Sequence, residues 1–156
     1  MIGTLLFQIP GVISQSFFAE GSADSTDLPR IWRRSLIFCY ALVLPAMIGL
    51  LLGVKPLLGL FGPGYVDNGA NLLRLITLSI PFVSFNSIFL MRKRIENKLG
   101  WIVGANILVN GVLLVVGLGF LEHLSIDAFG YALLVGHGLL TLVGLSSLIR
   151  KRISSN

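Results

Sequence analysis

Charged residues are scarce in this sequence of 156 residues, of which only 12% are Asp, Glu, Lys or Arg. Hydrophobic residues make up 54% of the chain, and the mean hydropathy is +0.88. A water-soluble fold of this length could not bury so much apolar surface. The scarcity of charge therefore excludes an ordinary soluble domain and indicates a membrane protein.

Cysteine and catalytic motifs are also nearly absent. Cys39 is the single cysteine, so an intrachain disulfide framework is excluded. The sequence contains no GxxxxGK[ST], HExxH, CxxC or GxSxG motif. None of the seven acidic residues lies in the middle of an apolar run, where a proton or sodium relay would place one. We expect no enzyme activity, no cofactor and no metal site.

The sequence contains several apolar runs that are long enough to cross a bilayer. A hydrocarbon core about 30 Å thick needs roughly 20 helical residues at 1.5 Å each. The period-2 alternation of a membrane barrel is missing, so we expect helices. The full spans are expected at residues 35–54 (with room to continue to 61), 71–91, 99–121 and 128–149, and a partial span at 2–19. The predicted fold is one all-α polytopic membrane helix bundle covering residues 1–156.

Basic residues gather on one side of the membrane if these spans alternate. They precede the first full span, follow the second and follow the fourth, and the positive-inside rule then places them, with the C-terminus, in the cytoplasm. The group within LMRKRIENKLGW, residues 90–101, could instead bind lipid or nucleic acid. It is short and lacks interleaved aromatic residues, so we prefer an orientation signal and expect no nucleic-acid partner. The ten residues are Arg30, Arg33, Arg34, Arg92, Lys93, Arg94, Lys98, Arg150, Lys151 and Arg152.

The N-terminal run makes a poor secretory signal, because no Lys or Arg precedes Arg30. Alternation of the spans would place Met1 near mid-membrane or on the outer side. We therefore expect the chain to be the C-terminal part of a longer protein, or a truncated one.

Five polar residues within the spans are candidates for a substrate path. Arg74 lies about one turn from the outer end of its span, where it can snorkel to the interface or face an anionic substrate. Asn106 and Asn110 share a helix face. For these two, for Asn86 and for His137, hydrogen bonds between helices are the preferred interpretation, and lining a path is the alternative. A titrating role for His137 is the less favoured reading.

Two pairs of glycines, each four residues apart, predict places where helices approach closely. The pairs are Gly49 with Gly53 and Gly100 with Gly104. Small residues at this spacing allow helix backbones to come together in membranes.

Several sequence segments resemble segments in the C-terminal part of polysaccharide flippases of the multidrug/oligosaccharidyl-lipid/polysaccharide exporter superfamily. ISQSFFAEGS, residues 13–22, is similar to the family's phrase where a span ends at a cytoplasmic loop. PLLGLFGPGYVDNGANLLRLITLSIPF, residues 56–82, is similar to the family's turn between two spans. A basic turn, a span with Asn110 and a last hairpin at 126–136 follow in the family's order.

The resemblance implies two helical bundles around a cavity that opens alternately to either side. It implies a transporter that flips lipid-linked sugar intermediates across the cytoplasmic membrane for envelope polysaccharide synthesis. The first bundle has no counterpart in this sequence, so the implied partners are an N-terminal lobe or another membrane subunit, membrane lipid, and a lipid-linked oligosaccharide. Arg74 is the cation expected to touch a pyrophosphate-linked substrate. The alternative is a small membrane assembly or scaffold protein without transport activity, and a membrane enzyme ranks third.

Overall fold

The computed structural model describes residues 2–23 and 27–153 of the chain. These residues form a helical bundle without strands. Side chains are described for these ranges except at 2–7, 63, 68 and 151–153. The helices are α1 (Ile2–Ala23), α2 (Leu28–Gly59), α3 (Pro63–Ile95), α4 (Leu99–Gly119), the short α5 (Leu121–Leu124) and α6 (Asp127–Ile153). The helices α2, α3, α4 and α6 contain segments long and apolar enough to cross a membrane. The predicted all-α bundle with four full spans is confirmed.

The helices α2 and α3 extend well beyond the apolar runs expected at 35–54 and 71–91. The turn that joins them is short, because α2 ends at Gly59 and α3 begins at Pro63. Proline suits the first turn of a helix, where its missing N–H has no partner to lose. Gly62 directly before it has a φ of 117°, a conformation that glycine adopts most readily. At the other hairpin the expected span 99–121 ends earlier, at Gly119, and α5 forms a separate turn.

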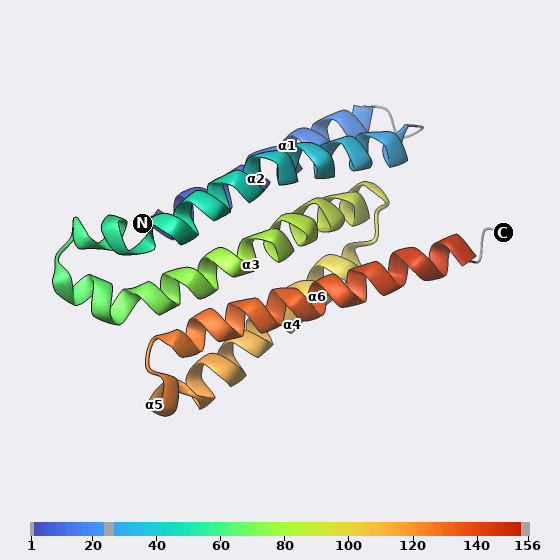
Figure 1. Cartoon of the computed structure of the whole chain (residues 1–156). Coiled ribbons are helices and arrows are strands. Elements are labelled where there is room, and N and C mark those ends of the chain that lie inside the picture. Colours follow the sequence, from blue (N-terminus) through green and yellow to red (C-terminus); the bar gives the residue numbers. More distant parts are fainter. Residues whose placement is uncertain (1, 24–26, 154–156) are drawn as a thin grey trace.

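The central helix is α3, and it contacts α1, α2, α4 and α6 (Figure 1). The α1 and α2 ribbons lie on one side of it, and α4 and α6 lie on the other. The Tyr40 hydroxyl on α2 donates a hydrogen bond to the Pro81 carbonyl on α3 at 2.9 Å. The buried residues of α3 are mostly apolar, and Ile80, Ile88 and Phe89 are fully buried. Because lipid tails are as apolar as the side chains, van der Waals packing and interhelical hydrogen bonds of this central helix, and not removal of apolar surface from water, hold the two flanking pairs together.

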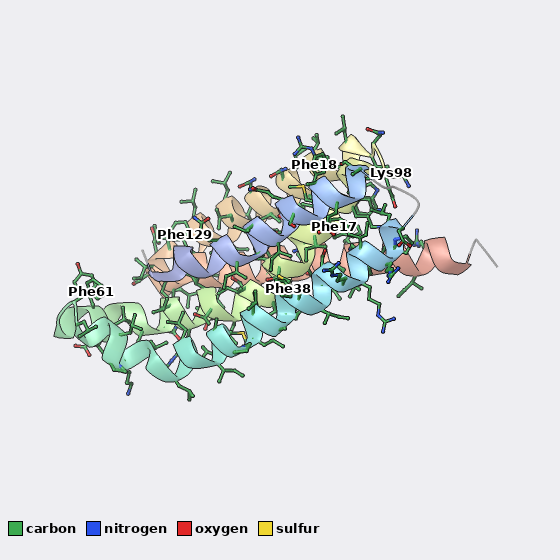
Figure 2. The ribbon with its side chains drawn as sticks, turned by 90° about the horizontal axis from the view of Figure 1, so that it is seen from above. Phe17, Phe18, Phe38, Phe61, Lys98 and Phe129 are labelled. Carbon is green, nitrogen blue, oxygen red and sulfur yellow. The ribbon has the colours of Figure 1, made fainter. Side chains whose placement is uncertain are left out.

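The two ends of the bundle differ in charge. The C-terminal end of α1, the N-terminal end of α2, the α3–α4 turn and the C-terminal end of α6 lie at one end, and the α2–α3 turn and α5 lie at the other (Figure 1). Figure 2 shows Phe18 and Lys98 at the first end and Phe61 at the second. We call the first end the basic end; Lys151 and Arg152 also belong to α6 there, but their side chains lie outside those described. The described basic side chains there are those of Arg30, Arg33, Arg34, Arg92, Lys93, Arg94, Lys98 and Arg150.

Close helix contacts occur at other glycines than the pairs expected from the sequence. A β-carbon added at Gly49, Gly53, Gly100 or Gly104 would have no neighbouring atom within 4 Å. A β-carbon at Gly130 on α6 would instead lie 2.8 Å from the Leu75 β-carbon on α3. Neither expected pair therefore makes a close contact within the described chain, because four-residue spacing fixes a common helix face but not which face meets a neighbour.

Candidate functional site

The five residues proposed to line a path occupy three separate places in the bundle. Asn86 on α3 and His137 on α6 meet between those helices. Asn106 and Asn110 lie on an exposed side of α4, and Arg74 is exposed on α3. Arg74 and Asn86 are twelve residues apart on one helix, which corresponds to about 18 Å along its axis.

The first place is a partly buried polar cluster between α3 and α6, formed by Asn86, His137 and Thr141. The Asn86 amide Nδ2 donates to the backbone carbonyl of His137 at 2.9 Å and lies 3.3 Å from His137 Nδ1. The Thr141 hydroxyl lies 3.1 Å from Asn86 Oδ1 and 2.9 Å from the same His137 carbonyl. Asn86 is only 2% exposed, so its amide is closed to a substrate in this conformation, whereas His137 and Thr141 are partly exposed.

Hydrogen bonds of this cluster join two helices across the membrane-spanning region. An amide buried among apolar side chains has to find partners within the protein, because lipid offers none. Asn86 therefore fixes the register of α3 against α6. Thr141 is not among the residues predicted from the sequence, although its spacing of four from His137 places both on one helix face.

The second place is an exposed surface of α4 that we call the α4 amide face, formed by Val103, Asn106, Ile107, Asn110 and Leu114. All five side chains are exposed. These positions recur at intervals of three and four residues, which places them on one side of the helix. The opposite side of α4 packs on α6 and includes the buried Ala105.

Both asparagines of the α4 amide face bond within their own helix. Asn106 Nδ2 donates to the Ile102 carbonyl and Asn110 Nδ2 donates to the Asn106 carbonyl, each at 2.8 Å. Among the described residues, neither amide bonds to another helix. The interhelical hydrogen bonds predicted for this pair are therefore not formed within the described chain. Each amide retains an N–H and an acceptor oxygen that a lipid tail cannot satisfy.

The third place lies toward the end of the bundle opposite the basic end, where Arg74 follows a polar contact between α3 and α6. Asn71 Nδ2 donates to Asp127 Oδ2 at 2.6 Å. This bond ties the start of α6 to the part of α3 away from the basic end, one turn before Arg74. The Arg74 side chain itself is exposed. Its guanidinium carries five donors and is available for an anion or for the polar surface of the membrane.

Charged side chains at the basic end form a packed cluster around Glu96. Arg92 Nε lies 3.2 Å from Glu96 Oε1, and Lys98 Nζ lies 3.5 Å from Oε2. Lys93 Nζ lies 4.0 Å from Oε2 and 3.4 Å from the Ser147 hydroxyl on α6. Cations from three positions therefore share one carboxylate.

Aromatic rings complete the Glu96 cluster, and they come from α3 itself, from α4 and from α2. Lys93 is 4% exposed, and its Nζ lies 4.8 Å from the centre of the Trp101 ring and 5.0 Å from that of Phe89. The Arg92 guanidinium carbon lies 5.2 Å from the centre of the Trp32 ring. Cation–π contacts of this kind contribute more when water is excluded. No aromatic residue lies between Arg92 and Lys98 in the sequence, because Phe89 and Trp101 flank this stretch and Trp32 comes from α2.

Among the described residues, no set of three His, Cys, Asp or Glu side chains lies close enough to hold a metal ion. Comparison of the chain with protein-family models, curated proteins and solved structures gave no match.

Proposed function

We propose that this chain is one lobe of a multi-pass transporter that flips lipid-linked sugar intermediates across the cytoplasmic membrane for envelope polysaccharide synthesis. The proposal rests on the resemblance of residues 13–22 and 56–82 to polysaccharide flippases. The basic end faces the cytoplasm in this proposal, as the positive-inside rule favours. The second lobe belongs to the same polypeptide or to another subunit.

The α4 amide face is the observation that supports the proposal most. Asn106 and Asn110 expose amides on a helix that is otherwise strongly apolar. Polar groups facing lipid are costly, so such groups in membrane proteins usually face a water-filled path or another helix. Free amide donors and acceptors match the hydroxyl groups of a sugar. We therefore assign this face to the sugar path between the two lobes.

Arg74 supplies positive charge toward the other end of the bundle in the same proposal. A pyrophosphate group carries several acceptor oxygens, and a guanidinium recognises such groups through paired hydrogen bonds. Because Arg74 is exposed, it can reach a substrate that moves along the face of the lobe.

A genetic complementation experiment tests the function. Deletion of the gene should abolish surface polysaccharide and cause the lipid-linked intermediate to accumulate on the cytoplasmic side. The complete protein should restore export, and a variant with Asn106→Leu and Asn110→Leu should fail to do so at equal membrane abundance. Ile107→Leu, on the same face and at the same depth, is the matched control and should restore export. Unchanged polysaccharide in the deletion strain would refute the proposal.

A second candidate is a membrane assembly protein, and the same exposed amides favour it. Asn side chains on a lipid-facing surface can bond a partner helix as well as a sugar. Cysteine crosslinking from Ile107→Cys to a separate membrane protein, with polysaccharide export intact in the deletion strain, would favour this candidate over the transporter.

A further inference from the structure

An amphipathic pocket lies between α1 and α2 near the basic end, and the functions discussed above do not use it. Its volume is about 280 Å³. The two helices run side by side here, with Phe17 labelled on α1 and Phe38 on α2 (Figure 2). Its lining comes from one side of α1 and the first turns of α2.

Polarity in this pocket changes in order along the helix axes. Val12, Ser16 and Glu20 line it from α1 at successive intervals of four residues. The α2 wall changes in the same direction, from Phe38 to Arg34. Each wall therefore leads from an apolar side chain inside the membrane to a charge at the basic end. The α1 wall covers about 12 Å at 1.5 Å per residue, which is on the order of the thickness of one leaflet of the hydrocarbon core.

Hydroxyl groups occupy the level between the apolar and the charged residues. Ser16 lines this level from α1 and Ser35 lines it from α2. A phospholipid has the same order of chemistry, with acyl chains, ester oxygens and then a charged headgroup. A free phosphate ion would make no favourable contact with the apolar side chains of Val12 and Phe38.

The charges at the mouth of the pocket have opposite signs. Arg34 and Glu20 are both exposed, and neither takes part in an ion pair with another described residue. An anionic lipid would satisfy Arg34 and be repelled by Glu20. A choline headgroup has no N–H to donate to the Glu20 carboxylate. An ethanolamine headgroup carries both a phosphate and a primary ammonium, so it satisfies both side chains.

We propose that this pocket binds phosphatidylethanolamine from the leaflet at the basic end, with its phosphate on Arg34 and its ammonium on Glu20. The ester region lies against Ser16 and Ser35, and one acyl chain follows Val12 and Phe38. The site does not depend on the transport function, because a structural lipid at this position would stabilise the α1–α2 pair in a transporter or in an assembly protein alike.

Native mass spectrometry of the purified chain with lipids of matched acyl chains tests the site. The wild-type chain should retain phosphatidylethanolamine about two- to fivefold more than phosphatidylglycerol or phosphatidylcholine, the range expected for one additional exposed charge pair. Glu20→Gln should remove the preference over phosphatidylglycerol. Arg34→Gln should lower retention of both lipids, and Arg34→Lys should restore most of it.

Arg33→Gln is the matched control, because Arg33 is exposed and adjacent but does not line the pocket. It removes the same charge and should leave the lipid preference unchanged. Helix content measured by circular dichroism verifies that each variant remains folded. Equal retention of the lipids by the wild-type chain, an unchanged preference in Glu20→Gln, or displacement of the lipid by millimolar inorganic phosphate would each overturn the proposal. None of these results would bear on polysaccharide export.

Discussion

Gly130 shows how a single hydrogen atom in place of a side chain sets the distance between two helices. A β-carbon at this position would lie 2.8 Å from the Leu75 β-carbon, which cannot move without its backbone. Gly130→Ala should therefore lower the free energy of unfolding in detergent by about 1–3 kcal/mol, the usual cost of overpacking. Reversible denaturation followed by circular dichroism measures it.

Gly104→Ala is the control for Gly130→Ala. No atom lies within 4 Å of a β-carbon at Gly104, so the change should be neutral or stabilise α4 by up to about 1 kcal/mol through helix propensity. Equal destabilisation by the two variants would contradict the observed packing of α3 against α6.

Asn86 makes a polar contact between α3 and α6, the same two helices that meet at Gly130. Asn86→Leu removes the hydrogen bonds to the His137 carbonyl and to Thr141, and it should lower stability by about 1–2 kcal/mol, at the upper end of values for hydrogen bonds in membranes. Asn110→Leu makes the same chemical change on an exposed face and should alter stability by less than about 0.5 kcal/mol. A loss of stability larger than this for Asn110→Leu would show that α4 does not pack as the structure has it.

The residue scale also shows what a sequence can and cannot indicate. Polarity within an apolar run was enough to select Asn86 and His137, because few residues tolerate such a position without a partner. Which residues become partners depends on the neighbouring helix. Asn86 therefore bonds to α6, whereas Asn106 and Asn110, chosen on the same grounds, face away from the bundle.

At the scale of the element, the end of α3 carries a charge cluster that joins other helices. Glu96→Gln leaves the nearly buried Lys93 with less compensation, so stability should fall by about 2–4 kcal/mol, toward the cost of breaking a buried ion pair. Adding Lys93→Met should recover part of this loss, because a matched apolar replacement removes the uncompensated charge. Chemical denaturation of the single and double variants gives both values.

Asp27→Asn provides the comparison for Glu96→Gln. Asp27 pairs with Arg30 at 3.5 Å, and the two side chains are 54% and 84% exposed. Screening by water limits such a pair to less than about 1 kcal/mol. Equal losses for the two variants would mean that Glu96 is no more important than a solvated surface charge.

Helix ends explain most of the differences between the expected spans and the observed elements. The apolar runs located the membrane-crossing parts of α2 and α3, but both helices continue into polar sequence. A run of apolar residues ends where the helix leaves the lipid. The backbone hydrogen bonds of the helix can continue beyond that point. The turn at Gly62 and Pro63 was recognisable from its residue types, since each has a backbone preference of its own.

At the scale of the whole molecule, composition determined the fold class, and the order of packing required the structure. A chain so apolar can satisfy its backbone in lipid only as helices or a closed barrel, and the period-2 pattern of a barrel is missing. The central place of α3 does not follow from hydropathy, because the α3 segment is the least apolar of the four membrane-crossing segments. The polar residues buried along α3 were the available signal, and they include Thr77, Ser79, Ser84 and Asn86.

Cysteine labelling in intact cells tests the alternation of the four spans most directly. Leu60→Cys and His123→Cys lie at the end opposite the basic end, and Ser22→Cys and Lys98→Cys lie at the basic end, while the native Cys39 is buried. A membrane-impermeant maleimide should label the first two in intact cells and the other two only after the membrane is permeabilised. Labelling of Leu60→Cys and Lys98→Cys from the same side would contradict the account.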